Sequence, residues 1–334
     1  MVAALALLAT VVAGKVCPPG TGTADIPLWK ESTVNSIIGT PGAALFLVVD
    51  TKAEFTWLTD QYVPAKSSTF QPLDGTFEGY YWGLTITGTR GRDVIRFGNN
   101  EYTTDLGLTT LSPPEVGNVN GVLALGGSAT SFFGQASPKW PKKIMGMHLP
   151  INNKKAGVLN LGYTNPAEYT GELSWIPVIS GDGWRASFGG ISVTGNRTAS
   201  HPGRNFAVWD SSEDTSAAPR DVVTAIYGKD PRINKITAVW SMPCDVIEGA
   251  TVRIRLGGRQ FSISRAALLR RDHTAPGQCI GNFAVAEDDN VHLGRSFMRT
   301  WYTAFSAEGV RRVGLARPVF PLGFTINSMS INDG

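Results

Sequence analysis

Residues 45–58 read Leu-Phe-Leu-Val-Val-Asp-Thr-Lys-Ala-Glu-Phe-Thr-Trp-Leu, and the fold prediction begins from this stretch. Five apolar residues lead into a single carboxylate, Asp50, which is followed by a hydroxyl residue, Thr51. A short apolar run of this kind is typical of a buried strand. An aspartate at the end of such a strand is costly to bury unless it is paired or hydrogen-bonded. Taken alone, Asp50 fits a turn or a helix cap as well as a functional site.

A second copy of the pattern lies in the other half of the chain. Residues 205–212 read Asn-Phe-Ala-Val-Trp-Asp-Ser-Ser, so apolar residues again precede an aspartate, Asp210, and a hydroxyl residue, Ser211. An apolar pair follows each aspartate at a similar distance, at residues 123–124 and 293–294, as in an internal repeat. Two such strand ends, one in each half, predict that Asp50 and Asp210 converge on one cleft.

The composition is that of a folded, β-rich protein. The chain has 334 residues, 42% hydrophobic and 17% charged, which is an ordinary globular balance and a length for about two domains. Its 38 glycines and 20 prolines separate many short apolar runs, which predicts strands and turns rather than helices. The net charge of +3 and the lack of a basic cluster interleaved with aromatic residues argue against a nucleic-acid partner.

The apolar run at residues 2–13 predicts a secretory signal peptide over residues 1–14. It is too short to cross a bilayer, and the alternative is a buried N-terminal strand. No other stretch is long and apolar enough to cross one, so we expect no membrane contact. The Asn-Arg-Thr sequon at Asn196 fits glycosylation, and together these features predict a secreted glycoprotein.

Three cysteines remain, Cys17, Cys244 and Cys279. In an oxidising compartment Cys244 and Cys279 could pair, and closing that loop would stabilise the fold by roughly 3–4 kcal/mol in the chain-entropy model. Cys17 is then left over, near the terminus or as a free thiol. The four histidines are scattered along the chain, so we expect no metal site and no cofactor.

Several further stretches, in this order and spacing, resemble the pepsin-like aspartic protease family over nearly the whole mature chain. Those that match are Ile38-Gly-Thr-Pro41, Val49-Asp-Thr51 with Trp57, Pro64-Ala-Lys-Ser-Ser-Thr-Phe70, Tyr169-Thr-Gly-Glu-Leu-Ser-Trp-Ile-Pro-Val178, Leu293-Gly294 before Phe297, Trp301-Tyr-Thr-Ala-Phe305 and Val313-Gly-Leu-Ala316. Cys244 and Cys279 fall where the family has a C-terminal disulfide.

The resemblance implies an all-β, bilobal fold with a central cleft and a β-hairpin flap. It implies an N-terminal lobe over residues 15–178, a C-terminal lobe over 179–318 and a tail over 319–334. We expect a monomer that binds a peptide, a protein or a small molecule in the cleft.

The resemblance also assigns roles to individual residues. Asp50 and Asp210 match the family's catalytic pair, in which two close carboxylates share one proton and act as general acid and base. Thr51 and Ser211 match the hydroxyl residues that tie the two loops together. Tyr81 falls at the flap position that covers substrate, with Trp57 beside it, although both also fit plain core or cross-strand aromatics.

The two motifs depart from the family's Asp-Thr-Gly pattern, because Lys52 and Ser212 stand where glycine is usual. Ala53 lacks the usual hydroxyl, Glu213 adds an acid beside the second aspartate, and an arginine replaces the usual aspartate after Leu293-Gly294. An ammonium within about 4–6 Å of a carboxylate lowers the carboxylate's pKa by roughly 1–3 units, so Lys52 threatens the shared proton. The alternative is that Lys52 points into solvent.

Three functions therefore stay open for the aspartate pair. The first is a secreted pepsin-like endopeptidase, a hydrolase with an atypical active site. The second is an inactive pseudoprotease that binds or inhibits a protein partner. The third is acid–base catalysis on a non-peptide small molecule. Retention of both aspartates and both hydroxyl residues favours chemistry, whereas loss of both glycines argues against ordinary proteolysis.

Overall fold

The strand that ends at Asp50 lies inside a seven-stranded sheet. The computed structural model describes residues 23–29, 32–81, 83–149, 156–179, 181, 183–195, 199–202, 205–230, 232–235 and 239–319. In spatial order the sheet contains β2 (Thr33–Ile38), β3 (Ala43–Asp50), β8 (Gly121–Ala124), β4 (Trp57–Leu58), β7 (Asn100–Leu108), β6 (Leu84–Phe97) and β5 (Gln71–Tyr81). All of its strands come from the first half of the chain.

The strand before Asp210 lies in a second sheet, built from the other half. Its order is β19 (Arg259–Ile263), β18 (Thr251–Leu256), β12 (Arg185–Thr194), β14 (Phe206–Trp209), β23 (Val291–Leu293), β15 (Ser216–Ala218) and β22 (Phe283–Val285), and β13 (Ala199–Pro202) pairs with β12. A smaller sheet contains β16 (Asn234–Lys235), β17 (Trp240–Pro243), β21 (Gln278–Gly281) and β20 (Leu269–Arg271). Its β21 carries Cys279, which forms the disulfide with Cys244.

The two larger sheets repeat one pairing pattern around the aspartates. In the first, β3 pairs parallel with β8, β8 antiparallel with β4, and β4 parallel with β7. In the second, β14 pairs parallel with β23, β23 antiparallel with β15, and β15 parallel with β22. The internal repeat expected from the sequence is therefore confirmed. Because parallel strands bring their carboxyl ends to one edge of a sheet, each aspartate emerges at an equivalent place.

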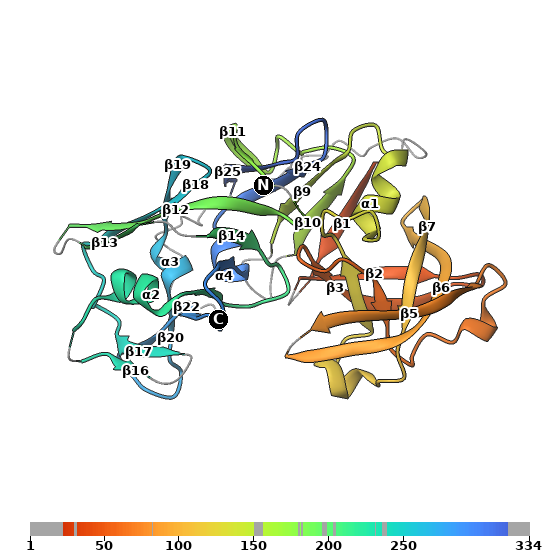
Figure 1. Ribbon diagram of the computed structural model, residues 1–334, viewed down its shortest axis with the longest axis horizontal. Helices are drawn as coiled ribbons and strands as arrows, with labels where there is room; N and C mark the ends of the chain where they lie inside the picture. Colours follow the sequence, from red (N-terminus) through yellow and green to blue (C-terminus); the bar gives the residue numbers. More distant parts are fainter. Residues whose placement is uncertain are drawn as a thin grey trace, which may run out of the picture.

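A six-stranded sheet joins the two halves. It contains β1 (Ala24–Leu28), β10 (Gly157–Leu161), β9 (Ile144–His148), β24 (Tyr302–Ser306), β25 (Arg312–Pro318) and β11 (Tyr169–Pro177). The red-to-yellow half and the green-to-blue half thus meet across it, on either side of the sheet in Figure 1. The fold is the expected all-β, bilobal one, with strands dominant. The boundary at residue 178 stays a prediction, because this sheet takes strands from both sides of it.

Alternating burial shows why these segments form strands. In β18 the side chains of Val252, Ile254 and Leu256 are buried while Arg253 and Arg255 face outward, which is the period-two pattern of a sheet with one covered face. Short helices fill the connections: α1 (Phe132–Ala136), α2 (Arg220–Tyr227), α3 (Arg265–Leu268) and α4 (Arg295–Met298), with the 3-10 turns η2 (Pro64–Lys66), η3 (Pro113–Val116) and η4 (Ser137–Lys139).

Trp184 anchors the core where the halves meet. Its ring is fully buried and lies 5.2 Å from Phe133 and 5.1 Å from Phe305, measured between ring centroids. Its indole N–H donates to the carbonyl oxygen of Leu125, 2.7 Å away. Leu125 in turn donates its backbone N–H to the carbonyl oxygen of Asp50. Packing at this junction therefore fixes the backbone that carries the first aspartate.

The β5–β6 hairpin extends from the first sheet toward the aspartates. Its register pairs Tyr80 with Thr85 and Tyr81 with Leu84, so both tyrosines lie at its tip. Tyr80 is 61% exposed. The hairpin is the flap that the resemblance implies.

Candidate functional site

Asp50 and Asp210 lie at the ends of equivalent strands, and their side chains are almost completely buried, at 3% and 1% exposure. Asp50 is the last residue of β3, and Asp210 follows β14 directly. Both line a single pocket. The structure thus brings together two carboxylates that are 160 positions apart in the sequence.

The residues after the two aspartates bind each other reciprocally. The backbone N–H of Thr51 donates to the hydroxyl of Ser211, and the backbone N–H of Ser211 donates to the hydroxyl of Thr51, each at 3.1 Å. The Thr51 hydroxyl donates to the carbonyl of Trp209 at 2.8 Å, and the Ser211 hydroxyl donates to that of Val49 at 2.6 Å. Because all four bonds are buried, they hold the two loops in one register.

Asp50 is the carboxyl group that retains a proton. Burial, and to a smaller extent the charge of Asp210, raise its pKa to about 7. The backbone N–H groups of Lys52 and Ala53 donate to Asp50 Oδ1 at 2.7 and 2.9 Å and oppose that increase, as the Lys52 ammonium does to a smaller extent. The effect of burial on the pKa is larger than these opposing effects, so Asp50 is neutral below about pH 7 and can act as an acid.

Asp210 accepts hydrogen bonds from its own loop and an ion pair from the other lobe. Ser212 donates its hydroxyl to Oδ1 at 2.7 Å and its backbone N–H to the same oxygen at 3.3 Å. The Lys52 ammonium lies 3.3 Å from Oδ2. Ser212 thus supplies a hydroxyl where the family usually has glycine. Acid–base chemistry at two close carboxyl groups needs one shared proton, and the raised pKa of Asp50 allows the pair to hold it.

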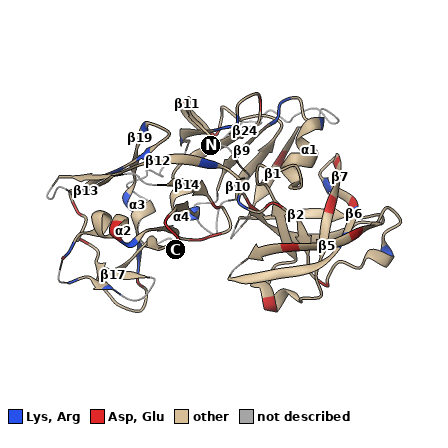
Figure 2. Ribbon diagram, viewed as in Figure 1, with Lys and Arg blue, Asp and Glu red and all other residues tan. Residues whose placement is uncertain are grey.

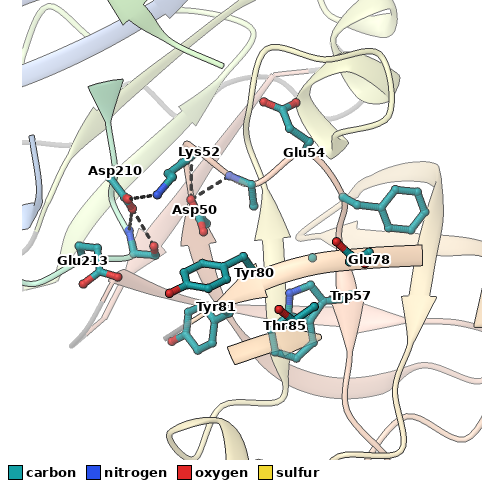
Figure 3. A pocket seen from close by; sticks show the side chains of 14 residues that line it. Asp50, Lys52, Glu54, Trp57, Glu78, Tyr80, Tyr81, Thr85, Asp210 and Glu213 are labelled. Carbon is teal, nitrogen blue, oxygen red and sulfur yellow. Dashed lines mark hydrogen bonds and ion pairs between the residues drawn. The ribbon is translucent and has the colours of Figure 1, made fainter. Parts of the chain in front are cut away.

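Lys52 points at Asp210, as Figure 3 shows, so the solvent-facing alternative is wrong. Burial alone would lower the pKa of Lys52, but the attraction of Asp210 and a smaller one from Asp50 outweigh it and raise the pKa. The ammonium therefore stays charged. It does not strip Asp50 of its proton, because its effect there is smaller than that of burial.

Arg295, which stands where an aspartate is usual, contacts three consecutive residues of the loop that follows Asp210. Its guanidinium donates to the carbonyl of Ser212 at 2.9 Å and pairs with Asp214 at 3.5 Å. Its backbone N–H donates to the carbonyl of Glu213. Arg295 therefore fixes the position of the loop that carries Asp210.

The pocket above the aspartates has a volume of about 340 Å³. Its lining residues come from both aspartate loops and from the flap (Figure 3): Asp50, Lys52, Ala53, Glu54, Phe55, Trp57, Glu78, Gly79, Tyr80, Tyr81, Thr85, Asp210, Ser212 and Glu213. Trp57 and Tyr81 pack edge to face with ring centroids 5.7 Å apart, so Tyr81 is held over the pocket by a buried indole.

Six of the lining residues were missed from the sequence: Glu54, Phe55, Glu78, Gly79, Tyr80 and Thr85. Glu54 and Phe55 directly follow the first motif, and Glu78 and Tyr80 lie on the flap strand, so closeness to these two features was the available signal. Glu54 accepts the backbone N–H of Ser128 at 3.0 Å and therefore has a structural partner.

The described residues hold no group of three or more metal-binding side chains, and none of their helices is long and apolar enough to cross a membrane. Several expectations lie outside the described residues: the signal peptide over residues 1–14, Cys17, the sequon at Asn196 and the tail beyond residue 319.

This combination of two β lobes, paired aspartate loops tied by hydroxyl residues, and a flap defines an aspartic-protease-type site. The sequence profile of the eukaryotic aspartyl protease family matches residues 33–318, so the chain belongs to that family. It is 25% identical to a pregnancy-associated glycoprotein of Equus caballus over 84% of this chain and 80% of that protein. It is 24% identical to pepsin A-5 of Mus musculus and 25% identical to a chymosin of Camelus dromedarius, each over 84% of this chain and 79% of the relative.

Proposed function

We propose that this protein is a secreted aspartic endopeptidase in which Asp50 is the acid and Asp210 is the base. One observation carries the proposal: two buried carboxylates, on loops locked together by Thr51 and Ser211, lie beneath one pocket in unlike environments. Asp50 keeps its proton up to about pH 7, whereas Asp210 accepts a hydrogen bond from the Ser212 hydroxyl and pairs with the Lys52 ammonium. Unlike environments of this kind separate an acid from a base.

The proposed reaction follows from these protonation states. The carboxylate of Asp210 takes a proton from a water molecule, whose oxygen forms a bond to the carbon of the scissile peptide group. Asp50 gives its proton to the carbonyl oxygen, so a neutral tetrahedral gem-diol forms. Transfer of the proton from Asp210 to the amide nitrogen then breaks the carbon–nitrogen bond, a gem-diol proton returns to Asp50, and an acid and an amine leave. Tyr81 and the flap exclude bulk water from this exchange.

The Lys52 ammonium contacts one oxygen of Asp210 and also lowers the pKa of Asp50 to a small extent. It therefore opposes the rise in that pKa that burial causes, so the basic limit of activity lies at lower pH with the ammonium than without it.

Secretion is part of the proposal. The disulfide between Cys244 and Cys279 supports an oxidising compartment, since such bonds are rare where thiols are kept reduced. The apolar run at residues 2–13 supports the same route.

Digestion of denatured haemoglobin between pH 2 and 8, with and without pepstatin, tests the proposal. We expect cleavage that pepstatin blocks and that both Asp50→Asn and Asp210→Asn abolish. Cleavage that survives in both variants would show that the pair is not the catalyst.

Binding without turnover is the second candidate, because the Lys52 ammonium already occupies one oxygen of Asp210. This function predicts that wild-type protein and both asparagine variants bind peptides with similar affinity and cleave none of them.

A further inference from the structure

The pocket above the aspartates is strongly acidic. Five carboxyl groups line it, those of Asp50, Glu54, Glu78, Asp210 and Glu213. Among the described lining residues Lys52 is the one basic side chain. With Asp50 neutral, four carboxylates face one ammonium. The chain as a whole carries a net charge of +3, and Figure 2 shows basic and acidic positions interspersed along the ribbon, so this excess of negative charge is local.

Two of these carboxylates are available to a ligand. Glu54 is bonded to the backbone of Ser128, and Asp210 is paired with Lys52. Glu78 and Glu213 are both exposed, and within the described part of the chain no hydrogen bond or ion pair is formed by either carboxylate. Glu78 comes from the flap and Glu213 from the second aspartate loop, and Figure 3 shows them on opposite sides of the flap tyrosines.

Aromatic side chains form the walls between these two carboxylates. Phe55, Trp57, Tyr80 and Tyr81 all line the pocket, and Tyr80 is largely exposed. Lysine and arginine combine an apolar stem, which packs on such surfaces, with a cationic end that aromatic faces and carboxylates attract. The aromatic walls and the two carboxylates together therefore fit a lysine or arginine side chain better than a purely apolar side chain.

We propose that this pocket takes a basic side chain of a peptide substrate, with Glu78 and Glu213 as the carboxylates that recognise it. The inference rests on the proposed function of the same site and adds its substrate class. The Lys52 ammonium is held on Asp210 at 3.3 Å and is attracted only weakly to Glu213, so Glu213 stays open to a second cation. The two glutamates are specificity residues, and they take no part in the proton transfers.

Matched peptides test the inference. Each pair shares one sequence and differs only by lysine or norleucine next to the scissile bond, so the two side chains have similar stems and differ in charge. Binding is measured by fluorescence anisotropy on Asp50→Asn, whose asparagine imitates the neutral carboxyl group and leaves the peptide uncut. Cleavage of the same pairs by the unsubstituted protein gives the ratio of their kcat/KM values.

We expect the lysine peptide to be preferred about three- to ten-fold at low salt, the size of one or two partly exposed charge contacts, and the preference to shrink as salt screens them. The double variant Glu78→Gln with Glu213→Gln should reduce the ratio to about one. Glu308→Gln, at an exposed glutamate that does not line the pocket, should leave it unchanged.

Equal binding of lysine and norleucine peptides, or a preference that persists in the double variant, overturns the inference. These results differ from failure of the proposed function. If the lysine peptide binds more tightly but neither peptide is cleaved, the proposed endopeptidase activity is refuted and the recognition of a basic side chain is supported. If both peptides are cleaved at equal rates, the recognition of a basic side chain is refuted and the endopeptidase activity is supported.

Discussion

The ammonium of Lys52 lies 3.3 Å from Oδ2 of Asp210, although Lys52 follows the other aspartate, Asp50, by two positions. The side chain of Lys52 is 44% exposed, whereas that of Asp210 is 2% exposed. A residue of one lobe thus neutralises the carboxylate of the other. This pairing leaves Asp50 as the group whose proton responds to pH near neutrality.

The first prediction concerns that pairing. Lys52→Met removes the ammonium and keeps most of the stem, so it removes a charge that lowers the pKa of Asp50. We expect the titration midpoint of Asp50 to move above its value of about 7, and the basic limb of the activity profile to move with it. Carbon-13 NMR of labelled aspartate carboxyl groups measures the midpoint without requiring turnover. Lys66→Met, at an exposed lysine outside the pocket, is the control, and an unchanged midpoint in Lys52→Met would refute the coupling.

The raised pKa of Asp50 also predicts how the stability of the fold depends on pH. Its pKa is raised in the folded state, from an ordinary value of 3.8 to about 7, so its neutral form is favoured by folding. Its contribution to stability is complete below about pH 3.8 and is lost as the pH rises through 7. Asp50→Asn removes this loss.

We therefore expect Asp50→Asn to be more stable than the unsubstituted protein at pH 8, by on the order of 2–4 kcal/mol, and the two to converge near pH 4. Urea denaturation across this range measures the gap. A gap that is constant with pH would mean that the pKa of Asp50 is not raised by folding.

The reciprocal bonds between the two loops predict a stability cost. Thr51→Val keeps the side-chain shape but removes the donor to Trp209 and the acceptor of the Ser211 N–H. Because both lost partners are buried, we expect a decrease of about 2–4 kcal/mol in the free energy of unfolding, together with a large loss of activity.

Thr103→Val, at an exposed position of β7, should change stability by less than about 0.5 kcal/mol. A double-mutant cycle of Thr51→Val with Ser211→Ala measures the coupling between the loops. Strictly additive effects of the two substitutions would contradict the mutual support that the bonds imply.

The disulfide gives a fourth prediction. Cys244 and Cys279 are 35 positions apart, so opening the bond restores loop entropy worth about 4 kcal/mol to the unfolded chain. We expect the Cys244→Ala, Cys279→Ala variant to lose most of this stability and to retain activity at temperatures where it is folded, because neither residue lines the pocket. Reductant should lower the melting temperature of the unsubstituted protein but not that of the variant, and equal sensitivity of the two would argue against the bond.

Local features of the sequence predicted much of the fold. Apolar runs that end in an aspartate predicted β3 and β14, because a buried strand needs consecutive or alternating apolar side chains wherever it lies. The position of the flap tyrosine, Tyr81, came from the family resemblance.

The residues that line the pocket were predicted less completely. Asp50, Asp210, Trp57, Tyr81 and Lys52 were all named in advance, yet the direction of Lys52 was left open, and Glu78 and Tyr80 were missed. Strand periodicity places alternate residues on opposite faces of a strand, but it does not show where a twisted hairpin tip will lie.

By itself, therefore, the sequence determined the strands, their repetition in two halves and the two aspartates, since these follow from hydrophobic patterning over a few neighbouring residues. Only the tertiary structure decided that Lys52 pairs with the distant Asp210, that Asp50 keeps the proton, and that Glu78 and Glu213 face the same pocket. The reason is physical: a charge responds to burial and to whichever groups lie within a few ångströms, and packing between the two lobes sets both.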